Sequence, residues 1–132
     1  MNSLLPRYEM ESSPDKHIDL TYLHQHTRSD PALMIEMINI YLEQTPVLVK
    51  AMKDGLEKKD WTLLNAAAHK IGPSFYVMGM YEENGSAIKK IQELATRQID
   101  GQLVARLVRA IEHICDIARE ELQQEIISLK KL

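Results

Sequence analysis

The segment from Asp60 to Gly79 reads DWTLLNAAAHKIGPSFYVMG. Its apolar residues recur at three- and four-residue spacing, which is the period of an amphipathic helix. Asp60 is a good N-cap because its carboxylate can accept the free amides of a first helical turn, and Gly79 is typical of a helix end. We therefore expect one long helix with a buried face. That face consists of Trp61, Leu64, Ala67, Ala68, Ile71, Phe75 and Met78.

A second long helix is expected upstream of this segment. Asp30-Pro31 favours a helix start, because aspartate caps the first turn and proline fits a position that needs no amide donor. Apolar residues then keep the helical period as far as Lys58 or Lys59. A kink or an interruption is expected at Thr45-Pro46, because proline lacks the amide that an inner turn requires.

Two more helices are expected downstream. One runs from about Tyr81 to Gln98, although Asn84-Gly85 weakens its first turn. The chain breaks at Asp100-Gly101, and the last helix then carries a clear apolar stripe from Val104 to Ile126.

The fold class that follows is all-α. Alternating β-branched runs are absent, and the breaks between the long helices are only about two to four residues, so successive helices must be antiparallel neighbours. The sequence predicts an antiparallel up-and-down four-helix bundle over residues 17–132. A short extra N-terminal helix is expected after Asp19, ending near Thr27 to Ser29, and residues 1–16 read as a flexible segment.

Composition narrows the class of protein. The chain has 132 residues, 45% of them hydrophobic, which fits one domain with a core of its own. Cys115 is the single cysteine and no signal sequence opens the chain, so a cytoplasmic setting is expected. No apolar run reaches the roughly 18 residues that span a bilayer. The net charge of -3, with acids and bases mixed, argues against nucleic acid as a partner. We expect a monomer that makes no membrane contact.

One histidine of the central segment lies away from the expected core. On a wheel of about 100° per residue, His69 is about 140° from Leu64. Its imidazole should stand out from a low surface that a partner can approach. The residues of that surface are Asn65, Ala66, Lys70, Gly72 and Pro73, with Tyr76 farther along the same face.

Histidine on such a surface is suited to carry a phosphoryl group. Neutral imidazole offers an unprotonated nitrogen near pH 7, which can attack phosphorus without a strong base. The resulting phosphoramidate transfers readily to a carboxylate. Most exposed histidines on helices have no function, however, so the residues around His69 must show whether it is a functional histidine.

Those residues resemble the histidine-containing phosphotransfer (HPt) domain family. The resemblance rests on the capping Asp60, the small residues that lead into Ala68-His69, the aliphatic Ile71, then Ser74, and a hydrophobic residue followed by Gly79. The stretch from Tyr41-Leu42-Glu43 through Pro46 to Leu56 is similar to the helix that precedes this motif in the family. The resemblance covers about residues 18 to 120.

The resemblance implies a four-helix bundle whose exposed histidine takes phosphate from a receiver-domain aspartate and donates it to another receiver. His69 is then the phosphoacceptor of a two-component phosphorelay, with response-regulator receiver domains and a hybrid sensor histidine kinase as partners. The chain would be a carrier rather than an enzyme, without a cofactor, and any Mg²⁺ would belong to the receiver. No Gly-rich phosphate loop suggests a nucleotide site.

The sequence departs from the family pattern just after the histidine. The family usually has lysine three positions later and glycine at four, where this chain has Gly72 and Pro73. Lys70 cannot replace that lysine, because residues one apart on a helix diverge by about 100°. Pro73 also removes the amide that would bond the carbonyl of His69, so a bend or a loosened turn is expected there.

Three alternatives follow from the residues. The first is a docking module that keeps the bundle but has lost transfer, which the Gly72 substitution favours. The second is a metal or cofactor bundle enzyme, but the sequence has no pair of Glu-x-x-His motifs. His24 and His26 diverge by about 200° on a helix and read as surface. The third is a reactive Cys115, which instead lies on the apolar stripe of the last helix and reads as a buried hydrophobe.

Overall fold

The computed structural model describes residues 16–132, and every regular element within them is a helix. The all-α class is confirmed. The flexible segment expected for residues 1–16 lies, except for Lys16, outside the described residues. The helices are α1 (Thr21–Thr27), α2 (Pro31–Lys58), α3 (Trp61–Val77), α4 (Tyr81–Arg97) and α5 (Gly101–Leu129).

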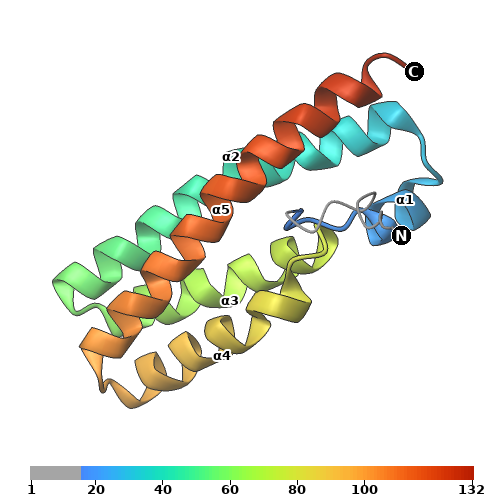
Figure 1. The fold of residues 1–132 in the computed structure, drawn as a ribbon. Coiled ribbons are helices and arrows are strands. Elements are labelled where there is room, and N and C mark those ends of the chain that lie inside the picture. The colour runs from blue at the N-terminus through green and yellow to red at the C-terminus, as the bar shows by residue number, and fades with distance from the viewer. Residues whose placement is uncertain (1–15) are drawn as a thin grey trace, which may run out of the picture.

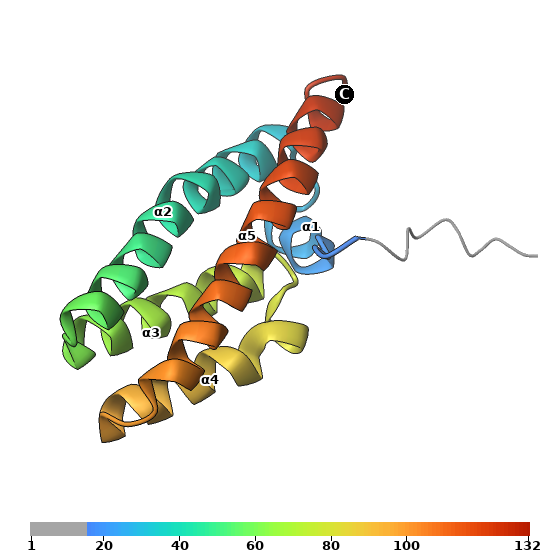
Figure 2. The same cartoon turned by 60° about the vertical axis from the view of Figure 1, so that its left-hand side comes forward.

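Helices α2 to α5 form the bundle shown in Figure 1. Helix α2 packs against α3 and α5, and α4 packs against the same two helices, so the four stripes of apolar residues meet in one core. Helices α2 and α5 are the longest and extend beyond α3 and α4 at the end where α1 lies (Figure 2). No helix of the described residues is long and apolar enough to cross a membrane.

Three of the five described helices, α2, α3 and α5, start at a capping aspartate. Asp30, Asp60 and Asp100 each accept a backbone amide of the first turn of the helix that follows. The caps predicted at Asp30 and Asp60 are therefore confirmed, and α5 begins at the expected break. Lys59 and Gln98, at the ends of α2 and α4, adopt the left-handed conformation that closes a helix.

The prolines do not end their helices. Helix α2 continues through Pro46 to Lys58, so the interruption considered at this position does not occur, and α3 continues through Pro73 to Val77. Both prolines are exposed, so their rings face solvent. Each therefore costs its helix one backbone hydrogen bond without disturbing the core.

A carboxylate of α5 holds the chain that enters α1. Glu121 accepts the backbone amides of His17 at 2.8 Å and Ile18 at 3.1 Å, and its Oε2 lies 2.8 Å from Nδ1 of His17. Because hydrogen bonds to a charged acceptor are the strong ones, this single side chain anchors the segment to the bundle.

The α3–α4 turn holds the same segment from its other side. The amide of Asp19 donates to the carbonyl of Met78 at 3.0 Å. Gly79 has φ +72°, and a Cβ at this position would lie 2.1 Å from the carbonyl oxygen of Asp19. Only glycine allows both the backbone conformation and the close approach. The two anchors together fix α1 beside the end of α3.

Candidate functional site

His69 lies on the exposed face of α3, as the helical wheel predicts. Its side chain is open to solvent, whereas Leu64, Ala68 and Ile71 are fully buried on the other face. Helix α3 is fixed at both ends, by the Asp60 cap and by the turn at Gly79, so the histidine has a rigid support. Position and exposure are what a phosphoacceptor requires of its scaffold.

The imidazole of His69 meets a side chain of the neighbouring helix. Nε2 of Gln92, on α4, lies 3.4 Å from Nδ1 of His69. Because Nδ1 faces α4, the other ring nitrogen, Nε2, is the one directed away from this contact. A carboxamide presents either its oxygen or its nitrogen after a 180° rotation, so Gln92 can also accept a hydrogen from Nδ1. In that orientation the Nε2 lone pair is free.

A hollow of about 280 Å³ adjoins the histidine between α3 and α4. The ring of Tyr81 lies over two glycines there: a Cβ at Gly72 would be 3.6 Å from its Cε1, and a Cβ at Gly85 would be 2.6 Å from its Cε2. The glycine at position 85 thus makes room for the tyrosine. The hollow is lined by His69, Gly72, Pro73, Tyr76, Tyr81, Ile88 and Gln92.

The structure brings most of the predicted supporting residues to the open surface around His69. Ala66, Lys70 and Pro73 are exposed, and the half-buried Asn65 donates to Thr96 of α4 at 3.4 Å. Gly72 is different. It also lines the hollow, but it is buried beneath Tyr81 rather than lying on the outer surface, because α4 covers this side of α3.

An aromatic cluster extends the surface toward α1. Tyr76 is 57% exposed, and its ring lies 5.1 Å from that of Tyr22 in an edge-to-face arrangement. Tyr22 in turn stacks on His26 at 5.5 Å. The spacing within α3 predicts Tyr76 on the histidine face, but the contribution of Tyr22 depends on how α1 docks, which no local pattern reveals.

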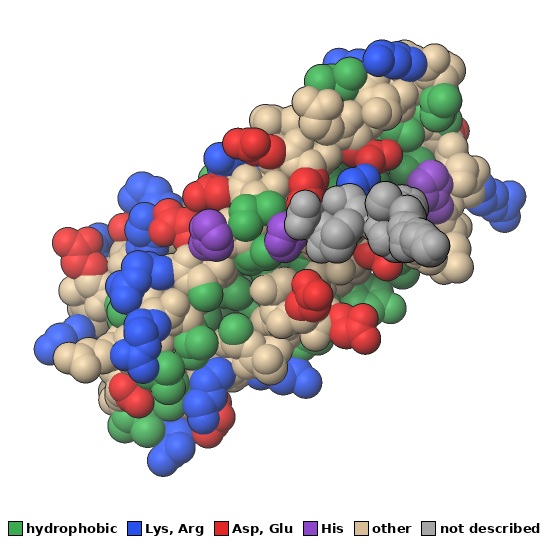
Figure 3. Space-filling view, viewed as in Figure 1, with side chains coloured by type: hydrophobic (Ala, Val, Ile, Leu, Met, Phe, Trp, Pro, Cys, Tyr) green, Lys and Arg blue, Asp and Glu red, His purple; other side chains and the backbone are tan. Residues whose placement is uncertain are grey.

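Helix α4, which carries Gln92, also carries the basic residues Lys89, Lys90 and Arg97. Lys90 and Arg97 both pair with Glu93, at 3.5 Å each. Lys89 forms no ion pair within residues 16–132 and lines a shallow depression together with Gln92 and Asn65. On the face drawn in Figure 3, carboxylates are interspersed among the Lys and Arg side chains.

The remaining candidates for chemistry do not assemble into a site. In the described part of the chain, no group of three or more His, Cys, Asp or Glu could hold a metal ion. His17 is bonded to Glu121, and His24 lies 2.9 Å from the hydroxyl of Ser29. Cys115 is buried, as predicted, and burial raises the pKa of its thiol to about 12. It is a neutral core residue at pH 7.

Comparisons with protein-family models, with curated proteins and with solved structures found no match for this chain.

Proposed function

We propose that this protein is a histidine phosphotransfer carrier, in which His69 accepts a phosphoryl group from a receiver-domain aspartate and passes it to another receiver. The observation that carries the proposal is the pairing of an exposed His69 with Gln92, which holds one ring nitrogen and leaves the other directed outward. The resemblance of residues 60–79 to the HPt family supports the same chemistry. Such a carrier would act in the cytoplasm, between a hybrid sensor kinase and response regulators.

The transfer step can be written with this chain's atoms. The Nε2 lone pair attacks the phosphorus of the aspartyl phosphate, an N–P bond forms, and the O–P bond breaks with its electron pair left on the aspartate carboxylate. The imidazole ring becomes cationic, and the Nδ1 proton is held by the oxygen of Gln92 in its rotated orientation. The reverse sequence delivers the phosphoryl group to the next receiver.

The surroundings of His69 suit an approaching domain better than a small substrate. Ala66 and Pro73 flank the ring without covering it, and Tyr76 with Tyr22 offers an apolar contact area. Lys89, which is free of ion pairs among the described residues, can face the acidic site of a receiver. Activation of the phosphoryl group, including any Mg²⁺, is left to the receiver.

A label-transfer experiment tests the proposal. Receiver domains phosphorylated with a labelled small donor are mixed with the protein, and we expect an acid-labile label to move to it. His69→Gln should remain unlabelled, and His113→Gln, a matched exposed histidine of α5, should be labelled as the wild type is. Label that persists in His69→Gln would contradict the assignment.

Gly72 at the position of the usual lysine favours one alternative, a docking module that binds receivers without being phosphorylated. This alternative predicts a stable complex with a receiver and no label on the wild-type protein. Gly72→Lys is the informative variant, because a Cβ at position 72 meets only Tyr81, at an ordinary 3.6 Å. Labelling of this variant alone would favour the docking module.

A further inference from the structure

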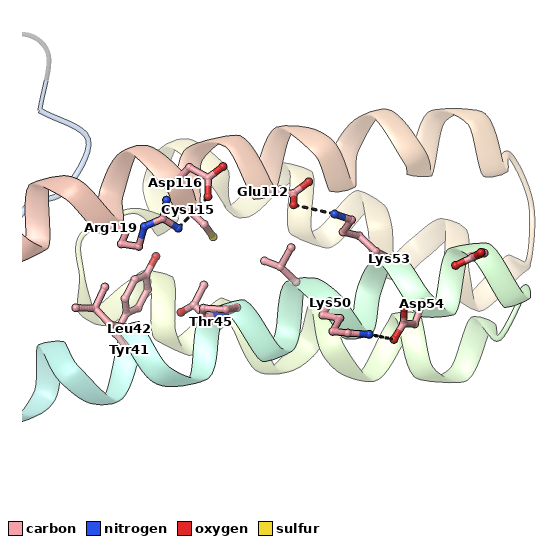
Figure 4. Close-up of a pocket in the computed structure, with 13 residues that line it drawn as sticks. Tyr41, Leu42, Thr45, Lys50, Lys53, Asp54, Glu112, Cys115, Asp116 and Arg119 are labelled. Carbon is pink, nitrogen blue, oxygen red and sulfur yellow. Dashed lines mark hydrogen bonds and ion pairs between the residues drawn. The ribbon is translucent and has the colours of Figure 1, made fainter.

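A cavity of about 400 Å³ lies between α2 and α5 and shares none of its lining residues with the hollow at His69. Figure 4 shows its side chains, with Tyr41 and Thr45 rising from α2 and Cys115 facing them from α5. These three residues are buried, and with Val49 they form an inner wall that is mostly apolar. A cavity of this volume is large enough for a small organic molecule.

One polar atom of the wall has no partner. Thr45 is only 3% exposed, and its Oγ1 makes no hydrogen bond. Leaving a buried hydroxyl unpaired costs about 1–3 kcal/mol, so such groups are rare in folded proteins. Valine has almost the same shape without this cost. A hydroxyl at this position is explained if something enters the cavity and bonds to it.

Besides the Thr45 hydroxyl and the Cys115 thiol, which can donate, the lining contains two oxygen atoms that can only accept. Pro46 has no amide, so the carbonyl of Leu42, another lining residue, lacks its usual donor four residues later. Tyr41 already donates its hydroxyl hydrogen to Sδ of Met80 at 3.3 Å, which leaves only the lone pairs of its oxygen. A molecule bound here is best matched if it supplies the hydrogen.

The mouth of the cavity disfavours a charged molecule. Lys50 pairs with Asp54 at 2.9 Å, and Lys53 pairs with Glu112 of α5 at 2.9 Å. The third cation of the lining, Arg119, is likewise held by a carboxylate, that of Asp116 at 3.1 Å. An anion would therefore have to displace a carboxylate. Among the described lining residues Glu57 is the carboxylate without an ion pair, but an ammonium group that reached the apolar wall would still lose its hydration.

We propose that this cavity between α2 and α5 binds a neutral, largely apolar molecule that carries one N–H or O–H donor, of the indole or phenol class, with Thr45 as its hydrogen-bond partner. The site is independent of the phosphotransfer proposed for His69. It is a binding site, and none of its buried groups is placed to do chemistry.

Indole is the probe for a direct test. When indole is titrated into the isotope-labelled protein, NMR should show saturable chemical-shift changes in the amides of residues 41–50 and 112–119. The methyl group of Met80 should shift as well, because its sulfur accepts the hydrogen bond of Tyr41, which lines the cavity. A dissociation constant on the order of 0.1–1 mM is expected for a ligand of this size. Absence of saturable changes, or changes centred on the hollow at His69, would overturn the proposal.

Two matched sets of controls define the chemistry. Thr45→Val should weaken indole binding about 3- to 10-fold but leave benzothiophene, which has the same shape without the N–H, unchanged. Equal effects on both ligands would contradict the role of Thr45. Tryptamine and indole-3-acetate carry opposite charges, and both should bind more weakly than indole. Tighter binding of either would show that the site is built for a charged molecule.

Discussion

The packing of Tyr81 over Gly85 gives the sharpest test of the geometry beside His69. A Cβ at position 85 would lie 2.6, 2.8 and 2.9 Å from three ring atoms of Tyr81, whereas ordinary contact begins at 3.4 Å. Gly85→Ala therefore forces the ring to move by about 1 Å, and overpacking of this kind costs about 1–3 kcal/mol. Alanine gains about 1 kcal/mol inside a helix. The variant should be destabilised by about 1 kcal/mol.

A double-mutant cycle separates these two effects. In a Tyr81→Ala background the clash is gone, so Gly85→Ala should stabilise the protein by about 1 kcal/mol through helix propensity alone. The coupling between the two positions is then about 2 kcal/mol, measured by urea unfolding followed by circular dichroism. Gly101→Ala is the control, because nothing lies within 4 Å of its added Cβ. A coupling below about 0.5 kcal/mol would refute the packing described for Tyr81.

Four further predictions concern the anchors, the core and the surface. Gly79→Ala should destabilise the protein by at least about 2 kcal/mol in urea unfolding, because it combines a strained positive φ with a backbone clash; an unchanged midpoint would contradict this. Because the pKa of Cys115 is raised in the folded protein, its thiol stabilises the fold below pH 9, and this contribution to the free energy of unfolding should fall as the pH rises from 9 toward 12, by up to about 1.4 kcal/mol per pH unit. The free energy of unfolding of Cys115→Ala should depend less steeply on pH. The same pH dependence in both proteins would contradict the burial of the thiol. Tyr22→Ala and Tyr76→Ala should each weaken receiver binding by roughly tenfold, measured by calorimetry, because the two rings form one contact. Binding that neither change affects would place the interface elsewhere. Lys70→Glu should slow association with a receiver several-fold at low salt and less at high salt; equal association rates in stopped-flow measurements would remove the steering role.

The main elements of the fold could be predicted from local chemistry. Helical periodicity revealed the long helices, and Asp30 and Asp60 marked two of their starts because a capping carboxylate acts within one turn. The effect of Pro46 was harder to judge. Its cost depends on whether the ring faces solvent or the core, and that is decided by how α2 packs, which periodicity alone does not determine.

The candidate site was predicted only on the helix that carries it. The wheel placed His69 on the exposed face, but its partner Gln92 is 23 residues away and comes from α4. Their meeting depends on the register between two antiparallel helices, which is set by Tyr81 of α4 seating over Gly72 of α3 and by core packing. Gly85, read from the sequence as a weak point of α4, is required because a side chain at this position would clash with the ring of Tyr81.

The nitrogen atom of His69 that carries the phosphate is the decisive observable for the proposed transfer step. After incubation with a phosphorylated receiver and under alkaline conditions, long-range nitrogen–proton NMR of the histidine rings distinguishes the two imidazole nitrogens. Because Nδ1 of His69 faces Gln92, we predict phosphorylation at Nε2 of this residue. An unmodified His69 ring, or phosphate on Nδ1, would contradict the proposed transfer through Nε2.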